Sequence, residues 1–165
     1  WPGGGRRGQC DQAGAGVTVI AWDGKTLAAD RRAVNGGLAR TTRKIQRRAD
    51  GNVLLAMSGQ SEVALEMVEW FISPSRDPKE FPAAARDGGA TLLVISRSGV
   101  GVSLEAYTMG PCPTVFTDEQ FAIGSGRDYA IAAMHLGRTA REAVEVACLF
   151  DVDCGNGIDT LELAP

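Results

Sequence analysis

The chain has 165 residues, of which 44% are hydrophobic and 22% are charged, and its formal net charge is −3 at pH 7. This length suits one domain with a substantial core, and the weakly acidic balance excludes the overall positive field of a nucleic-acid-binding protein. No apolar run reaches the roughly 20 residues that a membrane-spanning helix requires, and no secretory signal is visible, so we expect a cytoplasmic protein without a membrane partner.

Residues 1–16 are rich in glycine and show no hydrophobic periodicity. Such a composition does not repay the entropy lost on ordering, so we expect this segment to be disordered. We therefore divide the chain into residues 1–17, a leader that is processed or never translated, and one domain over 18–165. A GTG start codon specifies valine when it is read internally, and Val17 immediately precedes Thr18. Translation from that codon would begin Met-Thr, and methionine before a small residue is readily removed.

Short apolar and β-branched runs separated by Asp-Gly pairs dominate the first half of the chain. Asp-Gly between such runs predicts a hairpin. From Ser61 the hydrophobic period changes to about 3.6 residues, which predicts a helix that stops near Pro74. The expected elements are strands over 17–22, 25–30 and 53–57, a solvated basic strand edge over 40–48, and a helix over 61–73.

The second half of the chain begins with residues 74–89, which are rich in proline and charge. Further along, Thr139 and Glu142 form a capping-box pattern at a helix start. The expected elements are strands over 91–96, 101–107 and 121–123, helices over 127–137 and 140–150, and a final strand over 155–163. Grouped strands and grouped helices predict an α+β fold with antiparallel sheets rather than an alternating Rossmann unit.

Histidine and cysteine, the usual zinc ligands and partners of a catalytic nucleophile, are few. The single histidine, His135, falls inside a predicted helix, where we interpret it as structural. The four cysteines are scattered and form no Cys-x-x-Cys pair, so we expect reduced thiols and no zinc site. A serine or cysteine nucleophile paired with histidine would have to use His135. The base of an enzyme built from this chain is therefore expected to be another group.

Four separated segments share a pattern with one known family. They are Thr18-Val19-Ile20-Ala21, Ala28-Ala29-Asp30-Arg31-Arg32, Arg43-Lys44-Ile45 and Ala122-Ile123-Gly124-Ser125-Gly126. Each motif is weak by itself, but in this order and spacing they resemble proteasome β subunits and the bacterial peptidase HslV. The resemblance extends from Thr18 to about Leu163. It implies the four-layer α-β-β-α sandwich of the N-terminal-nucleophile hydrolases and a threonine-type endopeptidase with Thr18 as its nucleophile.

Elementary chemistry explains these residue types. A threonine hydroxyl needs a base, and the α-amino group of the same residue can serve once Thr18 begins the chain. An α-amine titrates near ~8, close to the pKa that suits a general base at cellular pH. A nearby ammonium keeps that amine deprotonated, a role that the resemblance gives to Lys44, with Asp30 as its ion-pair partner. Gly59 matches the family's glycine whose backbone N–H forms the oxyanion hole.

Two further site residues follow from the resemblance. Ser125 is implied to lie near the nucleophile and to help hold its amine. Asp151 matches the family's late aspartate, and Asp153 remains an alternative counterpart. Cys154 stands where the family usually has serine, so hydrogen bonding at that point is expected to be weaker.

The resemblance also implies an assembly. We expect a homo-oligomeric ring that hides the site, with a possible ATPase partner that feeds it unfolded polypeptide, and neither a metal nor an organic cofactor. Members of the family carry two long helices between the two groups of strands. Residues 74–89 are too short and too rich in proline for the second of these helices.

Other interpretations stay open at this level. Taken singly, Asp30 fits a turn acid, Lys44 a solvated cation, and residues 124–126 a plain strand-to-helix turn. A catalytically inactive structural subunit of the same fold would keep its leader, and a small-molecule amidohydrolase would use the same nucleophile. A nucleotide-binding loop at 124–126 is disfavoured because the lysine of a P-loop is absent there.

Overall fold

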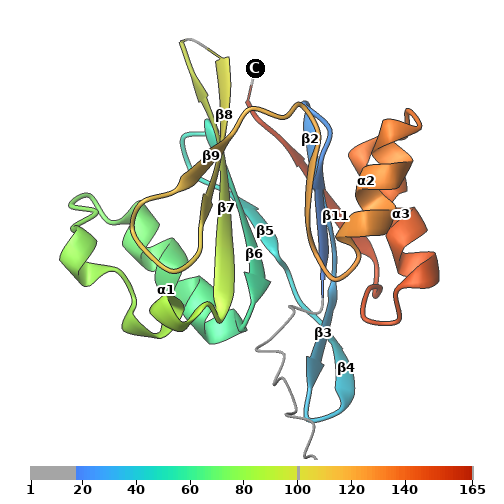
Figure 1. The fold of residues 1–165 in the computed structure, drawn as a ribbon, viewed down its shortest axis with the longest axis horizontal. Coiled ribbons are helices and arrows are strands. Elements are labelled where there is room, and N and C mark those ends of the chain that lie inside the picture. The colour runs from blue at the N-terminus through green and yellow to red at the C-terminus, as the bar shows by residue number, and fades with distance from the viewer. Residues whose placement is uncertain (1–17, 100, 165) are drawn as a thin grey trace, which may run out of the picture.

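The computed structural model describes residues 18–99 and 101–164, which fold into two antiparallel sheets, a separate hairpin and three α-helices (Figure 1). The strands are β1 Val19–Trp22, β2 Thr26–Asp30, β3 Arg32–Asn35, β4 Leu38–Thr41, β5 Ile45–Arg47, β6 Val53–Gly59, β7 Ala90–Ser98, β8 Gly101–Tyr107, β9 Thr114–Phe116, β10 Phe121–Gly124 and β11 Ile158–Glu162. The helices are α1 Ser61–Ile72, α2 Arg127–His135 and α3 Ala140–Phe150, with 3₁₀ turns at Pro78–Glu80 and Ala83–Asp87. The expected leader, residues 1–17, lies outside the described part of the chain.

Strands that are distant in sequence are neighbours in the smaller sheet. Its order is β10-β1-β2-β11, the larger sheet runs β5-β6-β7-β8-β9, and β3 with β4 forms a two-stranded sheet of its own. Ile20 of β1 lies opposite Ala29 of β2 on one side and Ile123 of β10 on the other. This register brings the beginning of β1, the end of β2 and the end of β10 to the same edge of the sheet.

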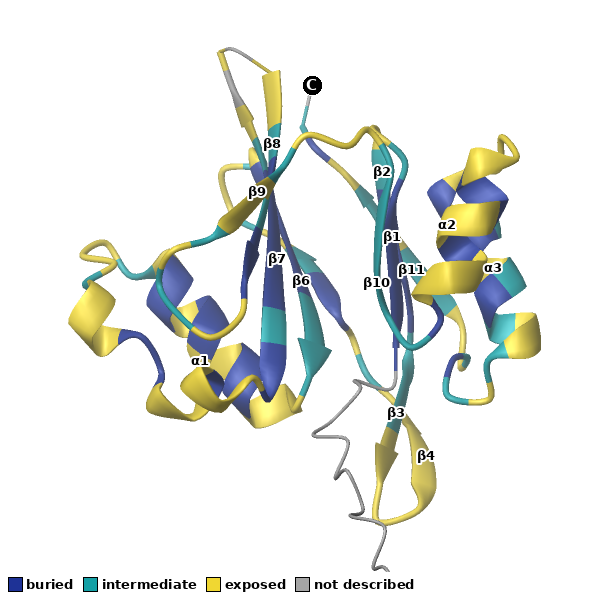
Figure 2. Ribbon diagram, viewed as in Figure 1, coloured by how far each residue is buried: buried dark blue, intermediate teal, exposed yellow. Residues whose placement is uncertain are grey.

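The strand β1 is buried on both faces (Figure 2). Ile20 and Trp22 belong to the hydrophobic cluster that lies between the two sheets. Val19 and Ala21 belong to the cluster that packs against α2 and α3. Two-sided burial explains why this strand is a continuous apolar run in the sequence instead of an alternating one.

The strand β7 has the same double contact on the other side of the molecule. Leu93 and Ile95 contribute to the cluster between the sheets, while Leu92 and Val94 join the cluster that contains the buried face of α1. Helix α1 therefore covers the outer face of the larger sheet, and α2 with α3 covers the outer face of the smaller one (Figure 1).

The helices form for reasons that are visible in the sequence. On α1 the buried residues Val63, Met67 and Phe71 are spaced four apart, which places them on one face. The Thr139 side chain accepts from the Glu142 backbone N–H and Glu142 reaches back to the Thr139 N–H, so the expected capping box at the start of α3 is confirmed. The expected α+β class with antiparallel sheets is also confirmed.

Several element boundaries differ from the sequence-based expectation. The basic stretch contains β4 and β5 as two separate strands, and β3 pairs with β4 through a turn at Gly36 and Gly37, whose φ angles are 57° and 79°. The short edge strand β9 was not expected, because its three residues follow two prolines. The last strand, β11, begins at Ile158 instead of residue 155, because residues 151–157 form a loop around the end of β2.

Residues 74–89 contain only the two short 3₁₀ turns, in agreement with the expectation that a second long helix does not fit there. Phe81 and Ala85 from this segment are buried in the hydrophobic cluster that α1 forms with the outer face of the larger sheet. Within residues 18–99 and 101–164, every helix is too short or too polar to cross a membrane.

The packing between the sheets generates a stability prediction. Leu93 is 1% exposed in the intersheet cluster, so Leu93→Ala should lower the free energy of unfolding by roughly 2–5 kcal/mol through lost burial and an added cavity. Urea denaturation followed by circular dichroism measures the loss. The matched control is Leu149→Ala on α3, since Leu149 is 79% exposed, and it should change stability by less than about 0.5 kcal/mol. Equal effects of the two substitutions would contradict the described core.

Candidate active site

Thr18 lies directly before β1 and is buried. Its Oγ1 donates to Oδ1 of Asp30 at 3.0 Å, and the backbone N–H of Val19 donates to the same oxygen at 2.9 Å. The hydroxyl position follows from the sheet register, because the end of β2 is opposite the beginning of β1. The expected neighbours Thr18 and Asp30 are therefore brought together by the first hairpin.

Asp30 is a fully buried carboxylate at the end of β2. Its Oδ1 accepts from Lys44 Nζ at 2.7 Å in addition to the contacts from Thr18 and Val19. Its Oδ2 accepts the backbone N–H groups of Arg32 and Gly155, each at 3.0 Å. A carboxylate removed from water is tolerated only when donors and an opposite charge surround it, and Asp30 has both.

Lys44 reaches Asp30 from the residue before β5. The Lys44 backbone is fixed because its carbonyl accepts the Met57 N–H at 2.9 Å, at the end of the β5–β6 pairing. The side chain is almost entirely buried, and this burial lowers the pKa of Lys44 below its ordinary value although the ion pair with Asp30 acts in the opposite direction. An ammonium with a lowered pKa beside a threonine hydroxyl is able to stabilise negative charge that develops on the oxygen.

Ser125 contacts the other side of Thr18. The Thr18 N–H donates to Ser125 Oγ at 3.4 Å, and Ser125 Oγ donates to the Thr18 carbonyl at 3.2 Å. The flanking glycines permit this approach: a Cβ on Gly124, whose φ is +96°, would lie 2.2 Å from the Thr18 carbonyl oxygen. A Cβ on Gly126 would lie 2.9 Å from Val19 and 3.0 Å from Cys154. The Gly-Ser-Gly sequence thus reflects close packing against β1.

Asp151 caps the end of α3 and joins the same group of side chains. Its Oδ2 accepts from Cys154 Sγ at 3.3 Å, and Cys154 Sγ lies 3.8 Å from Ser125 Oγ. Burial opposes ionisation of Asp151, but hydrogen bonds from the Asp153 N–H, Ser125 and Cys154 outweigh it and keep the pKa of Asp151 below its ordinary value. Of the two aspartates left open by the sequence, Asp151 is the one whose carboxylate meets Cys154.

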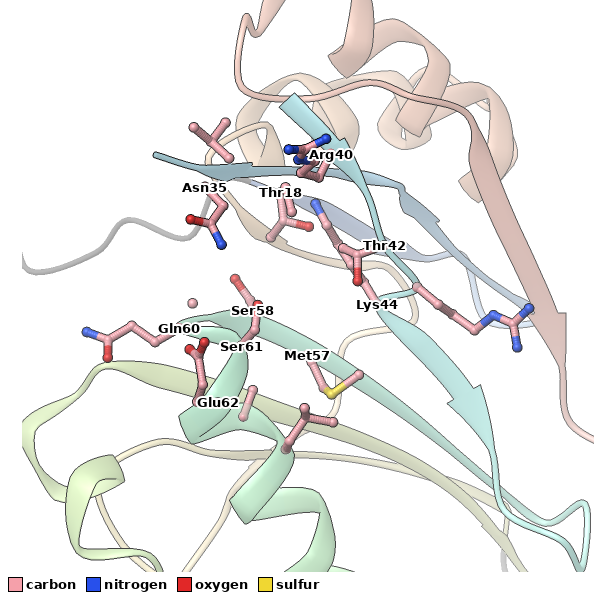
Figure 3. A pocket seen from close by; sticks show the side chains of 16 residues that line it. Thr18, Asn35, Arg40, Thr42, Lys44, Met57, Ser58, Gln60, Ser61 and Glu62 are labelled. Atoms are coloured by element: carbon pink, nitrogen blue, oxygen red, sulfur yellow. The ribbon is translucent and has the colours of Figure 1, made fainter. Parts of the chain in front are cut away.

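A cavity of about 620 Å³ opens next to Thr18 and Lys44. Figure 3 shows Thr18, Arg40 and Lys44 on one side of it and Ser58, Gln60, Ser61 and Glu62 on the other. Its volume is in the range of small-molecule and peptide side-chain pockets. The lining residues from the β3–β4 hairpin could not be predicted from the sequence, because the side chains of an exposed hairpin carry no core periodicity.

Gly59 also lines this cavity, at the end of β6 just before α1. Its φ is +97°, and a Cβ there would lie 2.4 Å from the Gly89 carbonyl oxygen, so this position requires glycine. The turn at Gly59 faces the same cavity as the Thr18 hydroxyl. Of the six expected site residues, Thr18, Lys44 and Gly59 line the cavity. Asp30 and Ser125 contact Thr18, and Asp151 contacts Cys154 beside Ser125.

Other candidate groups lie elsewhere. His135 is the last residue of α2 and is exposed, so it is a helix-end residue and not the helix-interior residue that the sequence suggested. The described residues contain no cluster of three or more His, Cys, Asp or Glu side chains that could hold a metal ion. Cys10 falls outside the described residues, and Cys112 is an exposed thiol.

The fold is similar to that of a solved structure. The chain is similar to eukaryotic HslV from Trypanosoma brucei, with a TM-score of 0.60 and 22% sequence identity, and the match covers 88% of this chain and 98% of that chain. This chain has an HslV-like fold. No protein-family model matches the sequence, and no curated protein does. At 22% identity the likeness concerns the fold, so the activity has to be argued from the residues of the site itself.

The buried carboxylate generates the first prediction for the site. Asp30→Asn removes the negative charge that offsets the burial of Lys44, so the free energy of unfolding should fall by roughly 3–5 kcal/mol. Chemical denaturation measures this loss. The control is Asp118→Asn, an exposed carboxylate that should be neutral within about 0.5 kcal/mol. An Asp30→Asn protein as stable as the control would show that the ion pair is not buried.

The lowered pKa of Lys44 generates a pH prediction. Because the folded pKa lies below the ordinary value of 10.5, the folded state binds fewer protons than the unfolded state in the window below 10.5. Stability conferred by Lys44 should therefore rise with pH through that window. We expect the unfolding free energy of the parent minus that of Lys44→Met to increase from pH 8 to pH 10.

The matched control for this experiment is Lys79→Met, because Lys79 is exposed. The difference between the parent and Lys79→Met should stay constant over the same pH range. A difference between the parent and Lys44→Met that is flat or decreases would mean that the pKa of Lys44 is not lowered in the folded protein.

Proposed function

We propose that this chain is a threonine-type endopeptidase subunit of an HslV-like or proteasome-like core particle. The observation that carries the proposal is the sharing of one buried carboxylate oxygen, Oδ1 of Asp30, by the Thr18 hydroxyl at 3.0 Å and the Lys44 ammonium at 2.7 Å beside an open cavity. The HslV-like fold supports the same conclusion. We further propose that the helix–sheet–sheet–helix packing is the four-layer sandwich of the N-terminal-nucleophile hydrolases.

The proposed nucleophile is Thr18 Oγ1 in a chain that begins at Thr18. The nitrogen that now donates to Ser125 Oγ then becomes a free α-amine, which takes the hydroxyl proton directly or through water. Lys44 stabilises the developing oxyanion of the threonine and disfavours protonation of the amine by like-charge repulsion. Asp30 orients Lys44 and the threonine, so it is a positioning residue for both.

Attack of Thr18 Oγ1 on the peptide carbonyl forms a tetrahedral intermediate whose oxyanion is stabilised by the Gly59 N–H. The protonated amine then gives its proton to the leaving peptide nitrogen as the C–N bond breaks, which leaves an ester on Thr18. A water molecule, deprotonated by the same amine, attacks this ester. Cleavage of the ester releases the carboxylate product and returns the proton to Thr18 Oγ1.

The remaining parts of the proposal concern surroundings and partners. Ser125 holds the amine, and Asp151 orients Ser125 together with Cys154. The substrate class is unfolded polypeptide, the subunit forms a homo-oligomeric ring in the cytoplasm, and an ATPase of the kind that unfolds proteins supplies the substrate. We also propose that residues 18–165 are the functional domain and that residues 1–17 are absent from the active form.

The test uses the chain whose first residue is Thr18, made by placing one removable methionine before it. A peptide epoxyketone should add one inhibitor mass to this protein in intact mass spectrometry, and a panel of fluorogenic peptide amides should include substrates that it cleaves. Thr18→Ala should remove labelling and reduce cleavage to background, because the nucleophilic oxygen is gone.

The matched control is Thr160→Ala on β11, an exposed threonine whose loss should leave labelling and cleavage unchanged. If the protein that begins at Thr18 takes up no inhibitor, the proposal fails, and a structural subunit of the same fold becomes the better interpretation. Hydrolysis of small amides without cleavage of any peptide would instead support a small-molecule amidohydrolase.

A further inference from the structure

The loop over residues 151–157 supplies three groups to the candidate site. Asp151 accepts from Cys154, Cys154 lies beside Ser125, and the Gly155 N–H donates to Oδ2 of Asp30. This loop lies between α3 and β11 and has neither helical nor strand pairing. Its backbone includes Asn156 with a φ of 62°, a conformation that residues other than glycine seldom adopt. Its shape therefore depends on contacts from outside.

Those contacts come mainly from the two residues that follow Asp30. The Arg31 N–H donates to the carbonyls of Gly155 at 2.9 Å and Gly157 at 3.1 Å. The Arg32 guanidinium donates through Nη1 to the carbonyls of Val152 at 2.5 Å and Cys154 at 3.4 Å. Two carbonyl oxygens thus converge on one guanidinium nitrogen, whose charge strengthens both hydrogen bonds.

Arg32 also contacts Asp30 through its backbone. Its N–H donates to Oδ2 at 3.0 Å, the same oxygen that accepts from Gly155. One residue therefore connects the carboxylate at the end of β2 with the loop that carries Asp151 and Cys154. Arg32 is not among the residues that line the cavity, although its neighbour Ala33 is.

We propose that the Arg32 guanidinium is a positioning element of the hydrolase site: by holding the carbonyls of Val152 and Cys154, it fixes the loop over residues 151–157 against Asp30 and Ser125. This inference rests on the proposed function and adds a residue to it. Arg32 acts through Asp30, Asp151 and Cys154 and touches neither the nucleophile nor the cavity. Its loss should consequently impair the chemical step and leave substrate binding intact.

Loss of the Arg32 guanidinium should lower the rate because catalysis tolerates only small displacements of the groups in the site. Without the guanidinium, the two carbonyls lose their charged donor and the loop is free to relax toward solvent, which draws the Gly155 N–H away from Asp30. A shift of about 1 Å in a supporting group costs roughly 10²-fold in rate. A methionine at position 32 keeps the length of the side chain but provides no donor, so it isolates the contribution of the hydrogen bonds.

The experiment compares the parent beginning at Thr18 with Arg32→Met, Arg32→Lys and Arg97→Met. Arg97 is the matched control, because it also donates to a backbone carbonyl near the C-terminus, that of Ala164 at 2.8 Å, but at a distance from the site along β7. For Arg32→Met we expect kcat on a fluorogenic peptide amide to fall roughly 10- to 100-fold with KM unchanged. Arg32→Lys, which retains a cationic donor, should recover part of kcat, and Arg97→Met should match the parent.

Hydrogen exchange provides the second readout. In Arg32→Met the amides over residues 151–157 should exchange faster than in the parent, while those of β6 and β7 should not change. Suppose that the parent is active and that Arg32→Met keeps full kcat, or raises KM without lowering kcat. Either result would overturn the proposal for Arg32 and leave the proposed function standing. A parent that neither cleaves peptides nor takes up the epoxyketone would overturn the proposed function itself, and the role of Arg32 in catalysis with it.

Discussion

The carboxylate of Asp30 is the group on which the arrangement of the site depends. It is fully buried, and its two oxygens accept from Thr18 and Lys44 on one side and from Arg32 and Gly155 on the other. A buried charge is tolerated only when such donors are in place. Since they belong to segments that are far apart in the sequence, satisfying this one side chain also fixes where β1, the start of β5 and the loop after α3 must lie.

Close backbone approach is the second constraint around the nucleophile. Gly124 and Gly126 leave room for Ser125 to contact Thr18, and the positive φ of Gly59 aims the turn after β6 at the cavity. None of these three positions accepts a Cβ without displacing neighbouring atoms. The central strands β1 and β7, which are buried on both faces, hold these turns in place, so the rigid core provides the precision that the proposed chemistry requires.

Much of the fold could be predicted from hydrophobic pattern. The two-sided burial of β1 and β7 gives continuous apolar runs, α1 shows helical spacing, and the capping box marks the start of α3. The hairpin β3–β4 and the strand β9 could not be predicted in this way, because exposed or very short strands lack the alternation of apolar and polar residues that burial imposes. For the same reason the position of Arg40 at the border of the cavity could not be predicted from the sequence.

By itself, the sequence determined the α+β class and suggested, through four short motifs, that Thr18, Asp30, Lys44 and Ser125 belong together. It did so because each motif is a short local stretch of chain, and the four in this order and spacing resemble proteasome β subunits and HslV. Only the tertiary structure decided that Asp151, and not Asp153, meets Cys154, and that Arg32 holds the loop beside them. Such choices depend on which side chain points inward after long-range packing, and no short stretch of sequence contains that information.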